Sequence, residues 1–348
     1  MRIVYFAASE RDGPSSRYRI YQYREALRQG GVDLVIAPAL SNRYFAAERG
    51  RGLLRFLRRA ATLATGLARR LAQLRYLRKA DGVVIEREFF PWLPPLFEWL
   101  LSRRRNGYVL ELDDAIYLSR GRRWKYPGLL RRARAVIAGN EHLASYARGL
   151  NPLVFVVPTT VSIAACPVKA SYTLGTPARI GWVGLASNFP HLAAAGAALH
   201  EVCAQLPARL VVVSARPPVL DLPIEFVPWD ERTETATIRT FDIGIMPLFD
   251  TAFARGKCGL KLLQYMSCGV PCIASPVGVN RDIIHSGDNG LLAADPAAWH
   301  DCLLQLLTDE ALRQRLGAAG RRTVELHYAL ETWGPRLAAL YSTLFRAS

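Results

Sequence analysis

The sequence has no run of about 18–20 uncharged apolar residues, so no transmembrane helix is expected. It begins with the apolar run 2–8, without the basic region and longer apolar stretch of a signal peptide, and this run predicts a buried strand. The six cysteines have no C-x-x-C spacing and no histidine cluster beside them, so neither zinc nor a redox motif is expected. We predict free thiols in the reducing cytoplasm and no metal.

Acidic residues are scarce in the first half of the chain. Among 348 residues, 45 Lys and Arg stand against 29 Asp and Glu, which gives a formal net charge of +16. Residues 1–165 hold 29 of the basic and 13 of the acidic side chains, so the whole excess lies there. The two halves are therefore expected to face different partners. A hydrophobic content of 51% is enough for full cores and argues against intrinsic disorder.

Short apolar runs alternate with longer helical patterns along the whole chain. The predicted strands are 2–8, 32–37, 82–86, 107–112, 134–138, 153–157, 178–183, 209–214, 224–227, 241–246 and 271–275. Their continuous apolar character is typical of parallel sheets that are covered on both faces. We predict an α/β fold with two doubly wound, Rossmann-like domains that face each other across a ligand-binding cleft. The domains are residues 1–163 and 164–327, and a C-terminal helix at 328–348 packs back on the first.

A glycine-rich loop in the second half carries the densest functional pattern. Residues 256–259 predict a tight loop that begins a helix at 260–267, with Lys257 and Lys261 at its start. Cations at this end oppose the helix dipole, whereas free backbone N–H groups and two ammonium groups suit a phosphate or diphosphate. A solvated helix start with two ordinary lysines is the alternative. A second glycine turn at 277–279 predicts another helix start.

This half resembles the donor domain of the GT-B glycosyltransferases, specifically the large retaining family-four group (glycosyl transferases group 1). The matching residues are 180–184, 242–247, 265–271, 274–275, Gly278, 282–284, 289–292 and 309–321, with looser matches at 107–115 and 138–140. The resemblance implies a GT-B enzyme that moves a sugar, with retention, from a UDP- or GDP-sugar. We expect an envelope or lipid-linked glycan as the acceptor, which would explain the basic charge and apolar face of the first half, and no metal or other cofactor.

The resemblance assigns donor-site roles residue by residue. Lys257 and Lys261 would hold the donor diphosphate and compensate the charge of the leaving group. Gly184, after the first strand of the second domain, would let the backbone approach the donor. Ser275 and Gly278 would bound a turn near the nucleotide or the sugar.

Two donor-site positions depart from the family pattern of paired glutamates. They hold Gly256, which contributes no side chain, and Gln264, whose neutral amide can still hydrogen-bond a ribose hydroxyl. Because of this departure, two alternatives stay open beside a transferase: a nucleotide-sugar 2-epimerase, and a catalytically degenerate binding module.

In the first half, polar residues follow predicted strands and point to the acceptor or to a phosphate. Two hydroxyls and two arginines that begin a helix suggest anion capture, or else a serine cap with solvated arginines; they are Ser15, Ser16, Arg17 and Arg19. Asp113 and Asp114 end a strand and would orient an acceptor hydroxyl or act as a base, or else cap the next helix. Residues 86–88 are a weaker candidate of the same kind.

Residues 49–80 contain ten basic side chains and no acidic one. On a helix, leucine and alanine side chains share one half, and the arginines predicted to face a membrane share the other: Arg55, Arg58, Arg59, Arg69 and Arg70. The pattern predicts peripheral attachment to an anionic membrane, on its inner face, with packing of the helix on its own sheet as the alternative. No nucleic-acid-binding motif accompanies the charge, so nucleic acid is not an expected partner.

Overall fold

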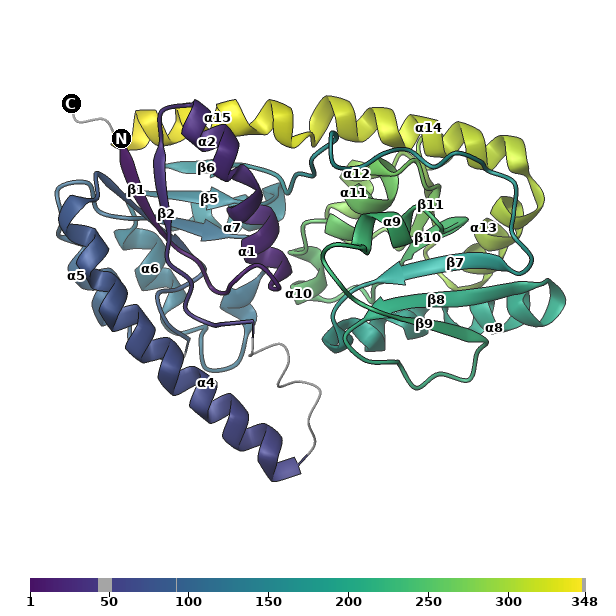
Figure 1. Cartoon of the computed structure of the whole chain (residues 1–348), viewed down its shortest axis with the longest axis horizontal. Coiled ribbons are helices and arrows are strands. Elements are labelled where there is room, and N and C mark those ends of the chain that lie inside the picture. Colours follow the sequence, from purple (N-terminus) through teal and green to yellow (C-terminus); the bar gives the residue numbers. More distant parts are fainter. Residues whose placement is uncertain (43–51, 92, 346–348) are drawn as a thin grey trace. The chain divides into compact units, whose positions relative to one another are not determined.

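The continuously apolar runs of the sequence form parallel strands in two separate sheets (Figure 1). The computed structural model describes residues 1–42, 52–91 and 93–345, and only the backbone at 52–56, 58 and 59. Two compact units result. The first unit comprises Met1–Thr160, Gly256–Cys258 and Leu330–Ser348, and the second comprises Val161–Arg255 and Gly259–Ala329.

The first unit contains a six-stranded parallel sheet in the order β2-β1-β3-β4-β5-β6. The strands are β1 (Arg2–Phe6), β2 (Asp33–Ile36), β3 (Gly82–Glu86), β4 (Val109–Leu112), β5 (Ala135–Ala138) and β6 (Val154–Val156). The order reverses between β1 and β3, so the segments that follow these two strands diverge there. Such a switch point is where doubly wound sheets bind ligands, outside the carboxyl ends of the strands.

Helices cover both faces of this sheet (Figure 1). They are α1 (Pro14–Arg19), α2 (Arg24–Gln29), α4 (Gly52–Gln73), α5 (Leu96–Ser102), α6 (Tyr126–Arg132), α7 (Glu141–Arg148) and α15 (Leu330–Phe345). The C-terminal helix α15 packs on the first unit, as predicted. A Cβ atom built on Gly30, at the end of α2, would lie 2.4 Å from the Cβ of Ala338 in α15, so the two helices are in close contact.

The second unit has a six-stranded parallel sheet in the order β12-β11-β10-β7-β8-β9. Its strands are β7 (Ala178–Val183), β8 (Ala208–Ser214), β9 (Ile224–Pro228), β10 (Ile243–Met246), β11 (Cys272–Ala274) and β12 (Leu291–Leu292). The order reverses between β7 and β10, which places a second switch point at their carboxyl ends. All eleven predicted strands are confirmed. The two-residue β12 is too short for a sequence pattern to reveal.

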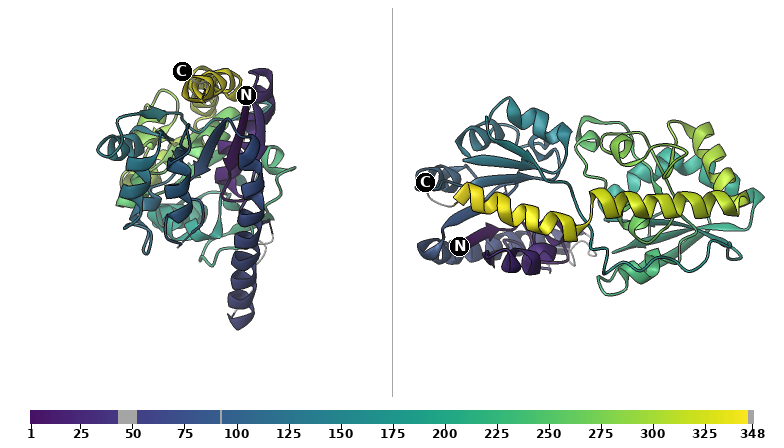
Figure 2. Two further views of the ribbon diagram at one scale, coloured as in Figure 1. Left: turned by 90° about the vertical axis from the view of Figure 1, so that its left-hand side faces the viewer. Right: turned by 90° about the horizontal axis from the view of Figure 1, so that it is seen from above.

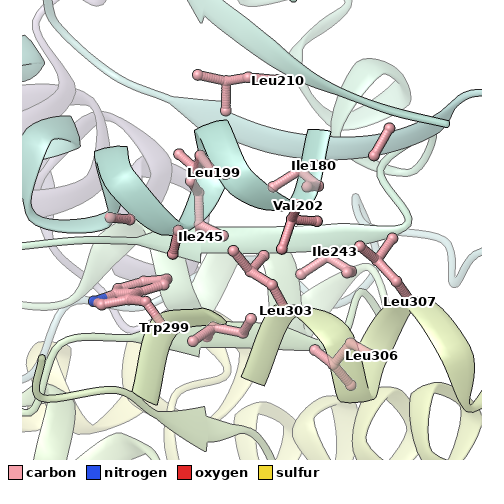
Figure 3. Packing of buried hydrophobic residues seen from close by; sticks show 14 of the residues in the cluster. Ile180, Leu199, Val202, Leu210, Ile243, Ile245, Trp299, Leu303, Leu306 and Leu307 are labelled. Carbon is pink, nitrogen blue, oxygen red and sulfur yellow. The ribbon is translucent and has the colours of Figure 1, made fainter. Parts of the chain in front are cut away.

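The helices of the second unit pack apolar faces on this sheet. They are α8 (Gly196–Gln205), α9 (Glu234–Ile238), α10 (Ala252–Arg255), α11 (Leu260–Ser267), α12 (Asn280–Ile283), α13 (Pro296–Thr308) and α14 (Glu310–His327). Trp299 and Leu303 of α13 and Leu199 of α8 form one cluster with Ile180 and Ile245 of the sheet (Figure 3). This core fixes β7 and β10, the strands whose ends form the switch point.

Helix α4 lies across the first unit, and its N-terminal end extends away from the sheet (Figure 2). Its buried residues are Gly66, Arg70 and Gln73, which recur at helical spacing and are small or polar. The opposite face is apolar and exposed, and Leu57 and Leu71 are 54% and 47% exposed. The alternative that the helix packs on its own unit is thus confirmed for residues 66–73, although a small and polar stripe makes that contact in place of the leucines.

Candidate functional site

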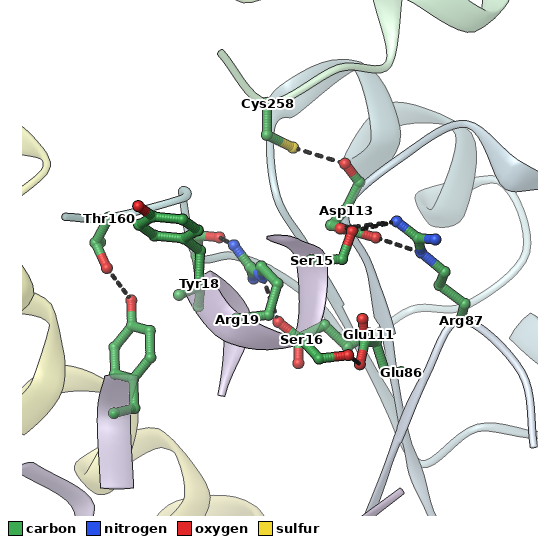
Figure 4. A network of polar contacts seen from close by, with 12 residues as sticks. Ser15, Ser16, Tyr18, Arg19, Glu86, Arg87, Glu111, Asp113, Thr160 and Cys258 are labelled. Carbon is green, nitrogen blue, oxygen red and sulfur yellow. Dashed lines mark hydrogen bonds and ion pairs between the residues drawn. The ribbon is translucent and has the colours of Figure 1, made fainter. Parts of the chain in front are cut away.

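Three segments of the first unit meet at its switch point (Figure 4). Helix α1 follows β1, Arg87 follows β3, and Asp113 and Asp114 follow β4. Because parallel strands bring their carboxyl ends to one edge of the sheet, residues far apart in the sequence come together here. We call this group the acceptor-side cluster.

Arg87 joins the segments of the acceptor-side cluster. Its guanidinium donates to both carboxylate oxygens of Asp113, at 2.7 and 3.0 Å, to Asp114 at 3.1 Å and to the Oγ of Ser15 at 2.5 Å. The two-pronged geometry is the strong form of an arginine–carboxylate pair. Arg87 also has a φ of +64°, which is costly for a residue with a side chain, so the surrounding contacts must hold it there.

Two acidic residues of the cluster differ in their proton affinity. Burial alone would raise the pKa of Asp113, but the charge and hydrogen bonds of Arg87 outweigh it and hold that pKa below its usual range. Burial, reinforced by the Asp113 charge, raises the pKa of the Glu86 carboxyl. Asp113 is therefore the ionised acceptor of hydrogen bonds, and Glu86 the carboxyl that most readily holds a proton.

The predicted anion-binding residues of α1 are largely buried. Ser16 is 0% exposed, and its hydroxyl donates to the Oε2 of Glu86 at 2.7 Å. Arg19 is 3% exposed; its Nε lies 2.5 Å from Glu111, which also accepts from the hydroxyl of Tyr5 at 2.5 Å. The structure thus corrects the prediction for Arg19, because a buried carboxylate occupies its guanidinium where the sequence suggested a ligand anion.

Arg17 lies on the same helix and is 6% exposed, with its guanidinium 4.9 Å from the ring centroid of Tyr18. Ser15 is the least enclosed of the two hydroxyls and contacts Arg87. A ligand role for Ser15 and Arg17 stays a prediction.

The second unit places two predicted donor-site residues together at its own switch point. Gly184 follows β7, and a Cβ atom there would lie 2.8 Å from the Cε of Lys261 and 2.9 Å from the ring of Trp182. The Nζ of Lys261 lies 5.3 Å from the centroid of that ring. A side chain at Gly184 would press on the Trp182 ring and displace Lys261, and the indole face attracts the lysine ammonium group.

Helix α11 begins at Leu260, as predicted, after Gly259 in the left-handed region with φ +69°. Gln264 lies within this helix and is 6% exposed. The hydroxyl of Ser275 accepts from the backbone N–H of Leu248 at 3.0 Å, so it also ties β11 to the segment after β10. A donor-binding role for Gln264 and Ser275 stays a prediction.

Gly278 forms the second predicted turn, and α12 begins two residues later. It has φ +54°, and a Cβ atom would lie 2.4 Å from the carbonyl oxygen of Arg255. Both the backbone conformation and the lack of space require glycine here. The turn keeps the backbone after β11 close to the chain that leads into the glycine-rich loop.

The tripeptide Gly256–Cys258 folds with the first unit. Asn140, the N-cap of α7, donates to the carbonyl oxygens of Gly256 and Lys257 at 3.1 Å each, and the Cys258 thiol donates to that of Asp113 at 3.1 Å. A Cβ atom at Gly256 would lie 2.6 Å from that of Ala115, so no glutamate fits at this position. Since Lys257 belongs to the first unit and Lys261 to the second, their convergence on one diphosphate stays a prediction.

Arg70 corrects the predicted membrane face. It is 0% exposed, and its guanidinium donates to the carbonyl oxygens of Ala7, Ala37 and Phe89. These three acceptors satisfy it inside the protein, so it cannot face a membrane. Arg69 is partly exposed and pairs with Glu10 at 2.7 Å. The side chains of Arg55, Arg58 and Arg59 lie outside the described part of the chain.

The sequence marked Arg87 only as a weaker candidate and gave no sign that Asn140 binds the glycine-rich loop. The run 86–88 at a strand end was the available signal for Arg87, but its contacts come from three different segments. Within residues 1–42, 52–91 and 93–345 the structure shows no cluster of three or more potential metal ligands. Over the same residues, no helix is both long and apolar enough to span a bilayer.

Two solved structures resemble this one along its whole length. Sucrose-phosphate synthase from Thermosynechococcus elongatus matches with a TM-score of 0.75 and 19% identity, covering 100% of both chains. HepE from Anabaena, solved in complex with UDP and glucose, matches with a TM-score of 0.71 and 13% identity, covering 99% of this chain and 100% of that one. The chain therefore has the GT-B fold, as predicted.

Residues 177–309 match the family "Glycosyl transferases group 1". N-acetyl-alpha-D-glucosaminyl L-malate synthase from Bacillus anthracis is 36% identical over 89 residues, which are 25% of this chain and 22% of that protein. The match thus spans under a quarter of that relative's length. Residues 177–309 therefore match the group 1 glycosyl transferases, which confirms the resemblance noted in the sequence.

Proposed function

We propose that the protein is a glycosyltransferase that moves a sugar from a UDP- or GDP-sugar to an envelope or lipid-linked glycan, with retention of configuration. The observation that carries the proposal is Lys261 beside Gly184, at the switch point of the unit that matches the group 1 family. HepE, whose fold this chain shares, binds UDP and glucose, which supports a nucleotide-linked sugar as the donor.

The proposed chemistry depends on stabilising the leaving diphosphate. Lys261 supplies a positive charge at the end of β7, and the backbone N–H groups at the start of α11 add to it. Asp113, held ionised by Arg87, accepts a hydrogen bond from the acceptor hydroxyl and orients it. The leaving diphosphate takes the acceptor proton, so no carboxylate nucleophile and no metal are needed.

Thermal shift with UDP, GDP and their sugars, followed by sugar release, tests this proposal. We expect one nucleotide to raise Tm in the wild type and to have a much smaller effect in Lys261→Ala. Binding without sugar release or transfer would favour the degenerate binding module, an alternative motivated by the absence of a side chain at Gly256. Conversion of the donor sugar to its 2-epimer would favour the epimerase. The absence of any nucleotide effect would refute the proposal.

We also propose that the first unit binds the inner, cytoplasmic face of an anionic membrane, where a lipid-linked acceptor lies. The support is the outward face of α4, where the exposed residues among the described side chains are, apart from Thr65, apolar: Leu57, Ala60, Ala61, Ala64, Ala68, Leu71 and Ala72. A helix that buries polar residues and exposes an apolar stripe lacks a partner for that stripe. Arg75, Arg78 and Lys79, which follow α4 in the chain, are exposed, and their charge suits an anionic lipid surface.

Helix α5 carries a second group of exposed apolar residues in the same unit. Leu96, Trp99 and Leu100 are 57%, 37% and 50% exposed, and the Arg103 guanidinium lies 3.3 Å from the ring centroid of Trp99. Phe89 links the helices, since its ring stacks on Phe97 of α5 and its carbonyl accepts from Arg70 of α4. Each nearby cation would add about 1 kcal/mol of attraction to an anionic leaflet.

Co-sedimentation with vesicles tests this part of the proposal. We expect binding to vesicles that contain phosphatidylglycerol, weaker binding to pure phosphatidylcholine, and a loss in the pair Leu57→Glu and Leu71→Glu. Leu326→Glu is the matched control, because Leu326 is 63% exposed on α14 of the second unit. No binding at low salt, or an equal loss in the control, would remove the membrane proposal and leave the transferase proposal standing.

A further inference from the structure

Two cysteines of the second unit lie together outside the proposed donor site. Cys166 belongs to the segment between β6 and β7, and Cys268 ends α11, the helix that carries Lys261. Both are free thiols in the structure. Cys166 is partly exposed, whereas Cys268 is 1% exposed. Cys166 is thus the more exposed of the two residues.

The contacts around the two cysteines hold their sulfur atoms and backbones side by side. The two thiols lie close enough for each to shift the pKa of the other. One nitrogen of the Arg321 guanidinium donates to the carbonyl oxygens of Cys166 and of Ser267, the neighbour of Cys268. The backbone N–H of Lys169 donates to the carbonyl of Cys268 at 2.9 Å. These hydrogen bonds hold the backbones of both cysteines in place near α14, so little chain movement is needed to bring the two sulfur atoms together.

The surroundings of Cys166 favour its thiolate. The hydrogen bond from Cys268 is the main cause that lowers the pKa of Cys166; hydroxyls of Ser267 and Thr235 and the charge of Arg321 add to it. Burial raises the pKa of Cys203 and of Cys302 instead. A thiolate is the nucleophile in thiol chemistry, so Cys166 should react before these two partly buried cysteines.

We propose that Cys166 and Cys268 are a modification site that forms a reversible disulfide by exchange with a low-molecular-weight disulfide. The Cys166 thiolate attacks one sulfur of the reagent, forms a mixed disulfide and releases one thiol. The Cys268 thiol then loses its proton, attacks the Cys166 sulfur and releases the second thiol. The cysteines lose two electrons and two protons in total, and the reagent gains them as two thiols. The site is independent of the proposed transferase activity.

Peptide mapping after treatment of the folded chain with oxidised glutathione tests the proposal. Cleavage after Arg and Lys yields peptides 149–169, with Cys166, and 262–281, with Cys268 and Cys272. We expect these two peptides to be joined, with the loss of two hydrogen atoms and fragmentation that assigns the bond to Cys268. A reducing agent should separate them again.

Variants and labelling rates provide the controls. Cys268→Ser should trap a mixed disulfide on Cys166, Cys166→Ser should give neither product, and Cys302→Ser should leave the joined peptides unchanged. In the untreated protein, iodoacetamide should label Cys166 at a lower pH than Cys302, and Cys268→Ser should move that midpoint upward. Joined peptides through another cysteine, the absence of joined peptides, or equal labelling of Cys166 and Cys302 would overturn the proposal.

Discussion

Replacement of Arg87 tests the acceptor-side cluster most sharply. The guanidinium makes four hydrogen bonds to Asp113, Asp114 and Ser15, and Arg87→Ala removes all of them. Asp113 would then be a carboxylate of 8% exposure without its cation. Breaking a buried ion pair costs about 3–5 kcal/mol, and the partial exposure of Arg87 and Asp114 reduces this to about 2–4 kcal/mol.

The loss should depend on pH in a defined direction. The folded-state pKa of Asp113 is depressed, so its contribution to stability is present above the unfolded pKa of about 3.9. It is lost as the pH falls through the lower folded value. The gap between wild type and Arg87→Ala should therefore be full at pH 7 and should shrink below about pH 4.

Urea denaturation at pH 7, 4 and 3 measures this gap. Arg87→Lys keeps the positive charge but cannot donate to both carboxylate oxygens of Asp113 at once, so we expect an intermediate loss of stability of about 1–2 kcal/mol. Arg69→Ala is the control, because its pair with Glu10 is 40% and 33% exposed and should contribute below about 1 kcal/mol. A loss in Arg87→Ala no larger than in this control, or a gap that does not change with pH, would refute the argument.

Three further predictions concern proton affinity, backbone strain and metal. Burial raises the pKa of Glu86 to about 7, so ionisation of this carboxyl lowers the stability of the wild type as the pH rises from about 5 to 8. Relative to the wild type, Glu86→Gln should therefore gain up to about 3 kcal/mol over that range. A stability difference that stays constant with pH in urea titrations would contradict this. Gly278→Ala should cost about 3 kcal/mol of stability, because Gly278 has a φ of +54° and its new Cβ atom would lie 2.4 Å from the Arg255 carbonyl oxygen. Gly287→Ala is the control and should cost about 1 kcal/mol, because Gly287 has a φ of +88° but its Cβ would meet nothing within 4 Å. Equal Tm shifts in the two variants would show that the close contact has no effect. Sugar transfer should persist in EDTA, and its loss, restored by a divalent cation, would show that a metal takes part.

Much of the fold could be predicted because its signals are local. Parallel strands that are covered on both faces appear in the sequence as continuous apolar runs, such as 178–183. The glycine-rich loop that ends at Gly259 likewise indicates the start of α11, because glycine readily adopts the left-handed backbone found there. Helix α4 was predicted as a helix, but its orientation was not. The buried Arg70 is satisfied by three carbonyls from separate segments, and such partners are set by the tertiary structure.

The candidate site was predictable in position more than in detail. Strand ends pointed to Asp113 and to the region of Arg19, but a periodicity cannot tell which arginine pairs with a carboxylate inside the protein. Arg19 pairs with the buried Glu111, whereas Arg87, the weaker candidate, binds Asp113. The packing of Gly256 against Ala115 could not be predicted either, because the two residues are far apart in the sequence and meet only in the folded unit.

Turnover of UDP- and GDP-sugars, followed by proton NMR, tests the proposed function most directly. The account predicts slow release of the sugar from one donor, with the same anomeric configuration in the first product. Lys261→Ala should fold normally and lose at least about 10²-fold in rate, the usual cost of removing one stabiliser of developing charge. A near-normal rate in Lys261→Ala, or no turnover of any donor by the wild type, would contradict it.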